Sequence, residues 1–309
     1  MKKLLIPFAV AASLVAGVAH AEWKPDGPIK MWIGFGAGGG TDTQVRALAE
    51  ELEALKGWRI IPENKAGGGG AVMAAQLKNE AADGQTLGVA INTTFDFATL
   101  SSDALSIDDF TYITTTAGSQ TGILARADSG WKTLEDVAAA AKSGTKIVWS
   151  NWGALVQHGS DLVAEKLDIE VNHLQLKGGK STLNALVAKD ANLAWGGGIQ
   201  RGLVAAGEVV ILASAENKPL VQAPDGKTLS EYGIDHKLGF QFVVVGPKGM
   251  DADAIDAIAN AIAEVLNNPD SKTAKFVAKQ YPPGPVIVKG DALEASLRAN
   301  LKANQALVK

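Results

Sequence analysis

The chain has 309 residues, enough for one large or two medium-sized domains, and carries a formal net charge of -4. A mildly acidic chain without a basic cluster argues against nucleic acid or an anionic membrane as its partner. The sequence contains no cysteine, so the fold must rest on a large apolar core instead of disulfide bonds. Abundant alanine and glycine with few aromatic residues favour closely packed layers of helices and strands.

The first segment of the chain has the features of a secretory signal peptide. Two lysines precede a nearly unbroken apolar run over residues 4–18, which is short for a membrane span. The run ends in a small-x-small sequence, so we expect residues 1–21 to be removed and the exported chain to begin at Glu22. No cysteine follows the run, which predicts a periplasmic protein without a lipid anchor; an uncleaved membrane anchor is the alternative.

Strand and helix patterns alternate along the rest of the chain. In chain order, short apolar runs predict strands over residues 29–35, 59–61, 86–91, 123–126, 146–149, 173–176, 193–195, 209–213 and 240–245. Apolar residues at helical spacing predict helices over residues 43–55, 71–79, 134–142, 155–167, 181–188, 252–266, 271–279 and 291–305. This alternation predicts an α/β protein with parallel sheets and helices on both faces.

Two glycine-rich connections from a strand to a helix lie far apart in the sequence, after Phe35 and after Trp149. Because ligands of such sheets sit at the carboxyl ends of strands, two connections of this kind predict two lobes with a cleft between them. The predicted lobes comprise residues 22–120 with 225–309, and residues 121–224. No low-complexity linker separates them, so we expect short crossing segments near residues 118–123 and 222–226.

The connection after the first predicted strand is suited to bind an anion. Residues 34–41 read Gly-Phe-Gly-Ala-Gly-Gly-Gly-Thr and lead directly into a predicted helix. Glycines let the backbone fold tightly and point several N–H groups at one spot, where the helix adds its positive N-terminal end. The sequence therefore predicts a seat for a carboxylate or a phosphate.

An ordered series of motifs extends along almost the whole exported chain. The motifs are Phe35-Gly-Ala-Gly-Gly-Gly-Thr-Asp42 with Arg46, Glu63-Asn-Lys-Ala-Gly67, Asp83-Gly-Gln-Thr-Leu87, Asp109-Phe-Thr-Tyr-Ile113, Lys177-Gly-Gly179 and Thr228-Leu-Ser-Glu-Tyr-Gly233. Together they resemble the substrate-binding receptors of tripartite tricarboxylate transporters, also called Bug receptors. The resemblance implies a two-lobed type II periplasmic-binding fold that captures small organic carboxylates and delivers them to a membrane permease.

The resemblance also implies that one ligand carboxylate lies against the first glycine loop. The residues that this role covers are Phe35, Gly38, Gly39, Thr41 and Asp42. From the residues alone, glycine permits close approach and Thr41 supplies a hydroxyl donor. Asp42 cannot attract a carboxylate directly, so it either caps the helix, orients a water molecule or accepts a hydroxyl of the ligand.

Two further polar turns follow predicted strands. Asn92-Thr93-Thr94 comes after the third strand, where the resemblance implies ligand contacts and the residues alone also fit a capping turn. Ser150-Asn151-Trp152-Gly153 lies between a strand and a helix and is expected to form the second lobe's side of the cleft. The family's small-Gly-x-Gly-Ser pattern is altered here, so we expect His158 to have a structural role instead of binding the ligand.

Three tryptophans of the second lobe, Trp149, Trp152 and Trp195, lie at or beside predicted strand ends. Trp195 precedes Gly196 and Gly197, where a backbone can approach a ligand closely. Tryptophan more often fills a core than contacts a ligand. The alternative hypothesis is that the distal part of the ligand is apolar or aromatic and packs against these rings.

Lysine and arginine side chains near the second lobe's strand ends are candidate partners for a distal carboxylate. Lys177 is placed best for this role, although a solvated side chain is the simpler interpretation, and Arg126 and Arg201 are weaker candidates.

Enzymatic alternatives find less support in the sequence. Residues 34–39 match G-x-G-x-x-G, and Glu63 follows at the end of the next strand, so a dinucleotide-binding oxidoreductase is one rival. Export weakens it, because nicotinamide cofactors are scarce outside the cytoplasm. No Gly-x-Ser-x-Gly sequence occurs and the four histidines lack metal-ligand spacing. We therefore expect a monomeric receptor without enzymatic activity, cofactor or metal; an exported sensor for a signalling partner is the other alternative.

Overall fold

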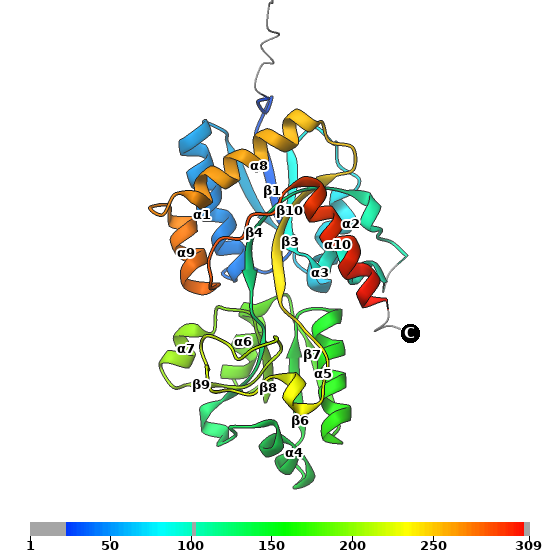
Figure 1. Ribbon diagram of the computed structural model, residues 1–309, viewed down its shortest axis with the longest axis vertical. Coiled ribbons are helices and arrows are strands. Elements are labelled where there is room, and N and C mark those ends of the chain that lie inside the picture. The colour runs from blue at the N-terminus through cyan, green and yellow to red at the C-terminus, as the bar shows by residue number, and fades with distance from the viewer. Residues whose placement is uncertain (1–22, 101–102, 306–309) are drawn as a thin grey trace, which may run out of the picture.

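The computed structural model describes residues 23–100 and 103–305, so the predicted signal peptide lies outside the described residues. Figure 1 shows two lobes, one above the other, each built on a sheet flanked by helices. Within the described ranges, none of the helices combines the length and apolarity that a membrane crossing requires.

The sheet of the first lobe has the strand order β2-β1-β3-β10-β4. Its strands are β1 (Ile29–Ile33), β2 (Ile60–Asn64), β3 (Thr86–Ile91), β4 (Phe110–Ser119) and β10 (Phe240–Pro247). β1 pairs in parallel with β2 and β3, whereas β10 runs antiparallel to both β3 and β4. Every residue of β3 is buried, as expected for a central strand covered on both faces.

The sheet of the second lobe repeats this arrangement with the order β7-β6-β8-β5-β9. Its strands are β5 (Gly122–Arg126), β6 (Ile147–Asn151), β7 (Val171–Gln175), β8 (Leu193–Gly196) and β9 (Val209–Ser214). β6 pairs in parallel with β7 and β8, and β5 runs antiparallel to β8 and β9.

The expectation of parallel sheets therefore holds for β1, β2 and β3 and for β6, β7 and β8, but not for the other strands of each sheet, and the chain path explains why. β10 begins beside the carboxyl end of β3, where Phe242 pairs with Ile91. β5 likewise begins beside the carboxyl end of β8, where Gly122 pairs with Gly196. A strand that enters a lobe from the other lobe starts at the edge facing the cleft, so it must run opposite to the strands that end there.

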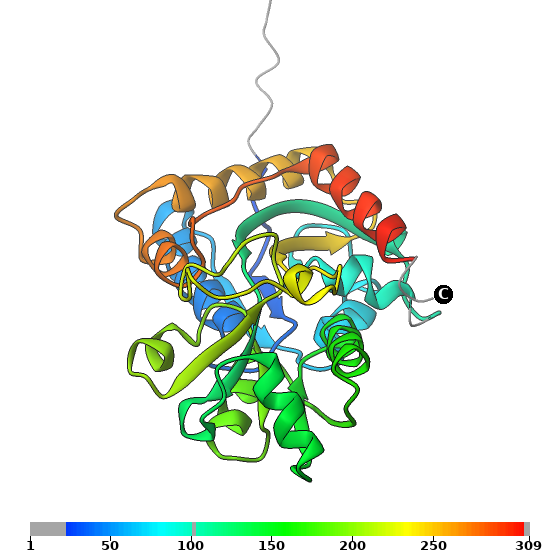
Figure 2. The ribbon, with the colours of Figure 1, turned by 60° about the horizontal axis from the view of Figure 1, so that its bottom comes forward.

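Helices cover both sheets. Those of the first lobe are α1 (Gly40–Lys56), α2 (Ala71–Leu77), α3 (Thr93–Asp96), α8 (Ala252–Asn267), α9 (Lys272–Gln280) and α10 (Gly290–Asn304). Those of the second lobe are α4 (Leu134–Lys142), α5 (Ala154–Leu167), α6 (Gly179–Val187) and α7 (Arg201–Ala205). Figure 2 shows α8 and α10 lying along β4, which closes that side of the first lobe.

The chain passes between the lobes at two neighbouring points. Only Gln120 and Thr121 separate β4 from β5, and a longer segment leads from β9 back to β10. The Thr121 hydroxyl donates to the carbonyl of Leu238 at 2.9 Å, and the Thr121 N–H donates to the carboxylate of Glu216 at 2.6 Å. The two crossing segments are therefore joined by hydrogen bonds of this one residue.

The segment before the second crossing lies against the second lobe. Lys227 forms an ion pair with Glu135 of α4 at 3.2 Å, and Thr228 forms a β-bridge with Ser214. We propose on these contacts that the second lobe extends to about residue 238, beyond the boundary expected near residue 225.

Candidate ligand-binding site

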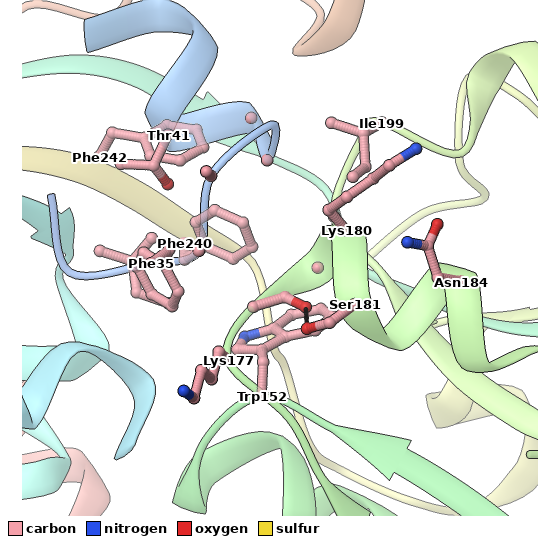
Figure 3. Close-up of a pocket in the computed structure, with 18 of the residues that line it drawn as sticks. Phe35, Thr41, Trp152, Lys177, Lys180, Ser181, Asn184, Ile199, Phe240 and Phe242 are labelled. Atoms are coloured by element: carbon pink, nitrogen blue, oxygen red, sulfur yellow. Dashed lines mark hydrogen bonds between the residues drawn. The ribbon is translucent and has the colours of Figure 1, made fainter. Parts of the chain in front are cut away.

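A pocket of about 300 Å³ lies between the carboxyl edges of the two sheets (Figure 3). The first lobe contributes Phe35, Gly36, Ala37, Gly39, Gly40, Thr41, Ile91, Phe240, Phe242 and Tyr281. The second lobe contributes Trp152, Lys177, Gly178, Gly179, Lys180, Ser181, Asn184, Gly197 and Ile199. Both lobes therefore enclose whatever occupies this volume.

The first lobe presents the N-terminus of α1 to the pocket. The helix begins at Gly40 after an extended Gly39, and the N–H groups of residues 40–42 have no partner among the described residues. Thr41 is buried and its hydroxyl forms no hydrogen bond within the described chain. This end of the pocket thus holds free donors and the positive end of a helix.

Asp42 stabilises the glycine loop through hydrogen bonds of its carboxylate. Its carboxylate accepts hydrogen bonds from the Gly38 N–H, Arg46 and Asn64, at 2.9, 2.9 and 2.8 Å. Burial opposes ionisation of Asp42, but these three donors outweigh it and hold its pKa below the ordinary value. Asp42 is not the N-cap of α1, because the helix begins earlier and Gly39 is its N-cap.

The second lobe presents a matching helix start. α6 begins at Gly179, and Gly178 adopts φ +144°, where a Cβ would lie 3.3 Å from Phe35 of the first lobe. The N–H groups of residues 179–181 have no partner among the described residues. The Gly36 N–H donates to the carbonyl of Lys177 at 2.9 Å, which brings the two glycine turns together. Two helix N-termini therefore face one pocket.

Aromatic side chains form another part of the pocket wall. Phe240 contacts Trp152 edge-on at 6.4 Å between ring centroids and Phe242 at 5.3 Å, and Phe242 lies 4.8 Å from Tyr281. Figure 3 shows Trp152 and Phe240 on facing sides of the cleft with Phe35 beside them. The pocket thus combines polar donors with a large apolar surface.

The charged groups at the pocket are cationic. Lys177 and Lys180 are exposed at its rim, and no aspartate or glutamate is among the lining residues. The described part of the chain contains no cluster of three or more histidine, aspartate or glutamate side chains suited to a metal ion. The electrostatic character of the site favours an anion.

The pocket brings together six of the residues that the sequence analysis singled out. These are Phe35, Gly39, Thr41, Trp152, Lys177 and Gly197. Thr93 and Gly153 line a neighbouring hollow of about 20 Å³ that shares Trp152 with the main pocket. Their contact with a ligand stays a prediction.

The remaining residues of the first lobe's candidate set stabilise the loops around the pocket. Asn92 accepts from the Gln241 N–H at 2.8 Å and donates to Asp96 at 2.8 Å, which ties the end of β3 to β10 and α3. Thr94 donates to the carbonyl of Gly69 at 2.6 Å. Their side-chain groups are already bonded to protein atoms.

Four candidates of the second lobe lie in its core. Ser150 donates to two backbone carbonyls at 3.2 Å, and Asn151 bonds to backbone and side-chain partners beneath the cleft. Trp195 stacks on Trp149 at 5.2 Å between ring centroids, and both rings are fully buried. Gly196 packs against core side chains, so none of the four lines the pocket.

The other candidates lie outside the pocket as well. His158 sits between Phe97 of the first lobe and His236, with ring centroids 6.5 and 5.5 Å away. Arg126 is bonded to Asp128 and to backbone carbonyls, and Arg201 of α7 is not among the lining residues.

Several residues that line the pocket were not predicted from the sequence. The start of α6 carries the same signal as the first loop, glycines directly before a helix, and this signal could have identified residues 178–181. Phe240 and Phe242 lie two residues apart in β10, so both lie on one face of the strand. This spacing does not show that the face borders the cleft. Tyr281 follows α9, and no local pattern places it near α1.

Comparison with known proteins identifies the family. The model of the tripartite tricarboxylate transporter family receptor matches residues 44–281. The UPF0065 protein in the gbd 5'region of Cupriavidus necator is 27% identical over 284 residues, which cover 88% of this chain and 85% of that protein. The periplasmic binding protein BugD has a similar structure, with a TM-score of 0.81, 23% identity and coverage of 92% and 97% of the two chains.

MatC from Rhodopseudomonas palustris, solved with bound malate, has a TM-score of 0.81 at 20% identity, with 93% of this chain and 100% of MatC covered. These likenesses confirm the two-lobed periplasmic-binding fold expected from the sequence. The chain belongs to the tripartite tricarboxylate transporter receptor family.

Proposed function

We propose that this protein is a periplasmic receptor that captures a small organic carboxylate with an apolar or aromatic body. It then delivers the ligand to a tripartite tricarboxylate-type permease. The observation that carries the proposal is a pocket that combines two helix N-termini with aromatic rings and has no acidic lining residue.

The anionic part of the ligand would lie at the glycine loops. Free N–H groups and helix dipoles stabilise negative charge without a counter-ion, and glycine lets a carboxylate approach the backbone closely. Lys177 and Lys180 at the rim would add long-range attraction or pair with a second carboxylate. A dicarboxylate and a monocarboxylate both fit this distribution of donors.

The body of the ligand would lie against the aromatic wall. Burying an aromatic ring against Trp152, Phe240 and Phe242 removes apolar surface from water and allows edge-on ring contacts. A sugar or amino acid with many polar groups would leave several of them without partners here.

Export and delivery complete the proposal. The signal peptide over residues 1–21 would place the receptor in the periplasm without a lipid anchor. It would act there as a monomer with no enzymatic activity. Closure of the lobes over the ligand would give the permease a shape that differs from the empty receptor.

A thermal-shift screen tests the proposal. The exported chain from Glu22 is unfolded, dialysed and refolded to remove ligand carried from the host, and is then heated with benzoate, phenylacetate, adipate, malate, NAD and benzamide. A carboxylate at a hundred times its Kd stabilises the folded protein by about 2.7 kcal/mol, a rise in Tm of roughly 5 °C.

The uncharged benzamide serves as the matched control for benzoate. Stabilisation by carboxylates without stabilisation by benzamide supports the proposed ligand class, and a preference for benzoate over malate supports the aromatic wall. Stabilisation by NAD alone, or by no carboxylate of the panel, contradicts the proposal.

A further inference from the structure

Tyr281 is a buried residue at the pocket, and its hydroxyl has no partner among the described residues. The residue follows α9, and its ring packs between Phe242 at 4.8 Å and Phe276 at 6.1 Å between centroids. Only 2% of the residue is exposed, and its hydroxyl forms no hydrogen bond within residues 23–100 and 103–305. A hydroxyl at a pocket wall without a protein partner is free to donate a hydrogen bond to a group that enters the pocket.

The hydroxyl lies at the start of α1. A side chain at Gly40, the first residue of that helix, would overlap the Tyr281 hydroxyl oxygen. Glycine at this position therefore makes room for a phenolic group beside the free N–H groups of residues 40–42. Both Gly40 and Tyr281 line the main pocket. A helix N-terminus and a neutral O–H donor thus meet at one point.

The second lobe covers this point when the lobes are in contact. Gly198 adopts φ +122°, and a Cβ built there would lie 2.5 Å from Cε1 of Tyr281. The absence of a side chain at Gly198 lets the second lobe close onto the ring. Burial raises the pKa of the Tyr281 hydroxyl above its ordinary value, so the group stays protonated and remains a donor.

We propose that the Tyr281 hydroxyl binds the ligand directly, by donating a hydrogen bond to the carboxylate seated at the N-terminus of α1. This inference rests on the proposed function and adds a residue from the C-terminal part of the chain to the first glycine loop. A carboxylate oxygen accepts several hydrogen bonds, and an O–H donor to a charged acceptor forms one of the shorter and stronger kind.

The variant Tyr281→Phe tests the inference, because it removes one oxygen atom and keeps the ring. Kd values for benzoate and adipate are measured by isothermal titration calorimetry on the refolded chain from Glu22. We expect the variant to bind about tenfold more weakly, the usual effect of losing one hydrogen bond to a charged group. Tyr232→Phe is the matched control, since Tyr232 lies in the second lobe away from the pocket, and its Kd values should equal those of the wild type.

The Tm without ligand reports whether Tyr281→Phe is folded, and loss of an unpaired hydroxyl should leave it unchanged or raised. Wild-type binding with an unchanged Kd in Tyr281→Phe overturns this inference and leaves the proposed function intact. Equal weakening in Tyr281→Phe and Tyr232→Phe also overturns it. A wild type that binds neither probe overturns the proposed function and this inference with it.

Discussion

The two lobes approach each other backbone to backbone at Gly69 and Gly153, and a single methyl group should disturb this contact. A Cβ built at Gly153 of the second lobe lies 3.2 Å from the Cα of Gly69 in the first lobe. Ordinary contacts between carbon atoms measure about 3.5–4.0 Å, so Gly153→Ala creates an overlap of a few tenths of an ångström. The Cα of Gly69 is a backbone atom and the position of the added Cβ is fixed by the backbone of residue 153, so neither can rotate away.

The strain of this variant should fall on the ligand-bound state alone. Gly153 has φ 176°, an extended conformation that alanine adopts without cost, so each lobe should fold normally. Adding a methyl group to a packed contact costs about 1–3 kcal/mol. If the empty receptor opens, that cost appears only on closure, and affinity should fall by about 5- to 150-fold.

Calorimetric Kd values and small-angle scattering check this prediction. We expect Gly153→Ala to have the wild-type Tm without ligand, a weaker Kd and less compaction at a fixed ligand concentration. Gly202→Ala is the matched control, because Gly202 lies on α7 of the same lobe with open space around it. Wild-type Kd and compaction in Gly153→Ala would show that closure does not bring these backbones together.

Two further substitutions probe the wall and the lobe interface. Trp152→Ala should weaken benzoate binding by at least about tenfold and malate binding less, whereas Trp152→Phe should retain most affinity for benzoate; equal effects on both ligands would contradict an aromatic wall. His236 is buried, and its pKa is lowered from 6.5 to about 4, mainly by burial and secondly by the nearby His158. Its neutral form is therefore favoured in the folded state. The contribution of this neutral side chain to the free energy of unfolding is complete above pH 6.5 and is lost as pH falls toward 4. At pH 4.5 the free energy of unfolding should be lower by about 2.5 kcal/mol. Urea unfolding of the wild type and His236→Leu at pH 7.5 and 4.5 should show this difference in their pH dependence; the same dependence in both would refute the assigned cause.

Regular elements with strong local patterns were predictable from the sequence. β3 occupies the expected residues 86–91, and α4 the expected residues 134–142. α4 also shows why its start was clear: Thr133 accepts from the Asp136 N–H and Asp136 from the Thr133 N–H, a capping box that marks a helix N-terminus.

β4 was not predicted, although it is the longest strand and joins the lobes. Its centre holds three buried threonines, residues 114–116, which interrupt the apolar run. Tertiary contacts satisfy them: Thr115 donates to the carbonyl of Val286 at 2.6 Å, and Thr116 donates to Gln44 at 2.8 Å. Local patterns do not reveal partners so distant in the chain.

The pocket was predictable only where one loop carries its signal. The first glycine loop lies at the pocket as expected, because a strand, glycines and a helix follow directly in the sequence. The aromatic wall depends on how β10 enters from the other lobe, and Tyr281 depends on where α9 ends. These positions follow from the packing of whole elements, so no short stretch of sequence contains them.

The pair of crossing segments has a consequence for the energetics of binding. Gln120 and Thr121 form the whole of one connection, and the hydrogen bonds of Thr121 hold the other connection beside it. Lobes tethered in this way sample far fewer relative orientations than lobes on a flexible linker, so bringing them together loses little entropy. Closure of the lobes should accordingly subtract little from the affinity that the contacts inside the pocket provide.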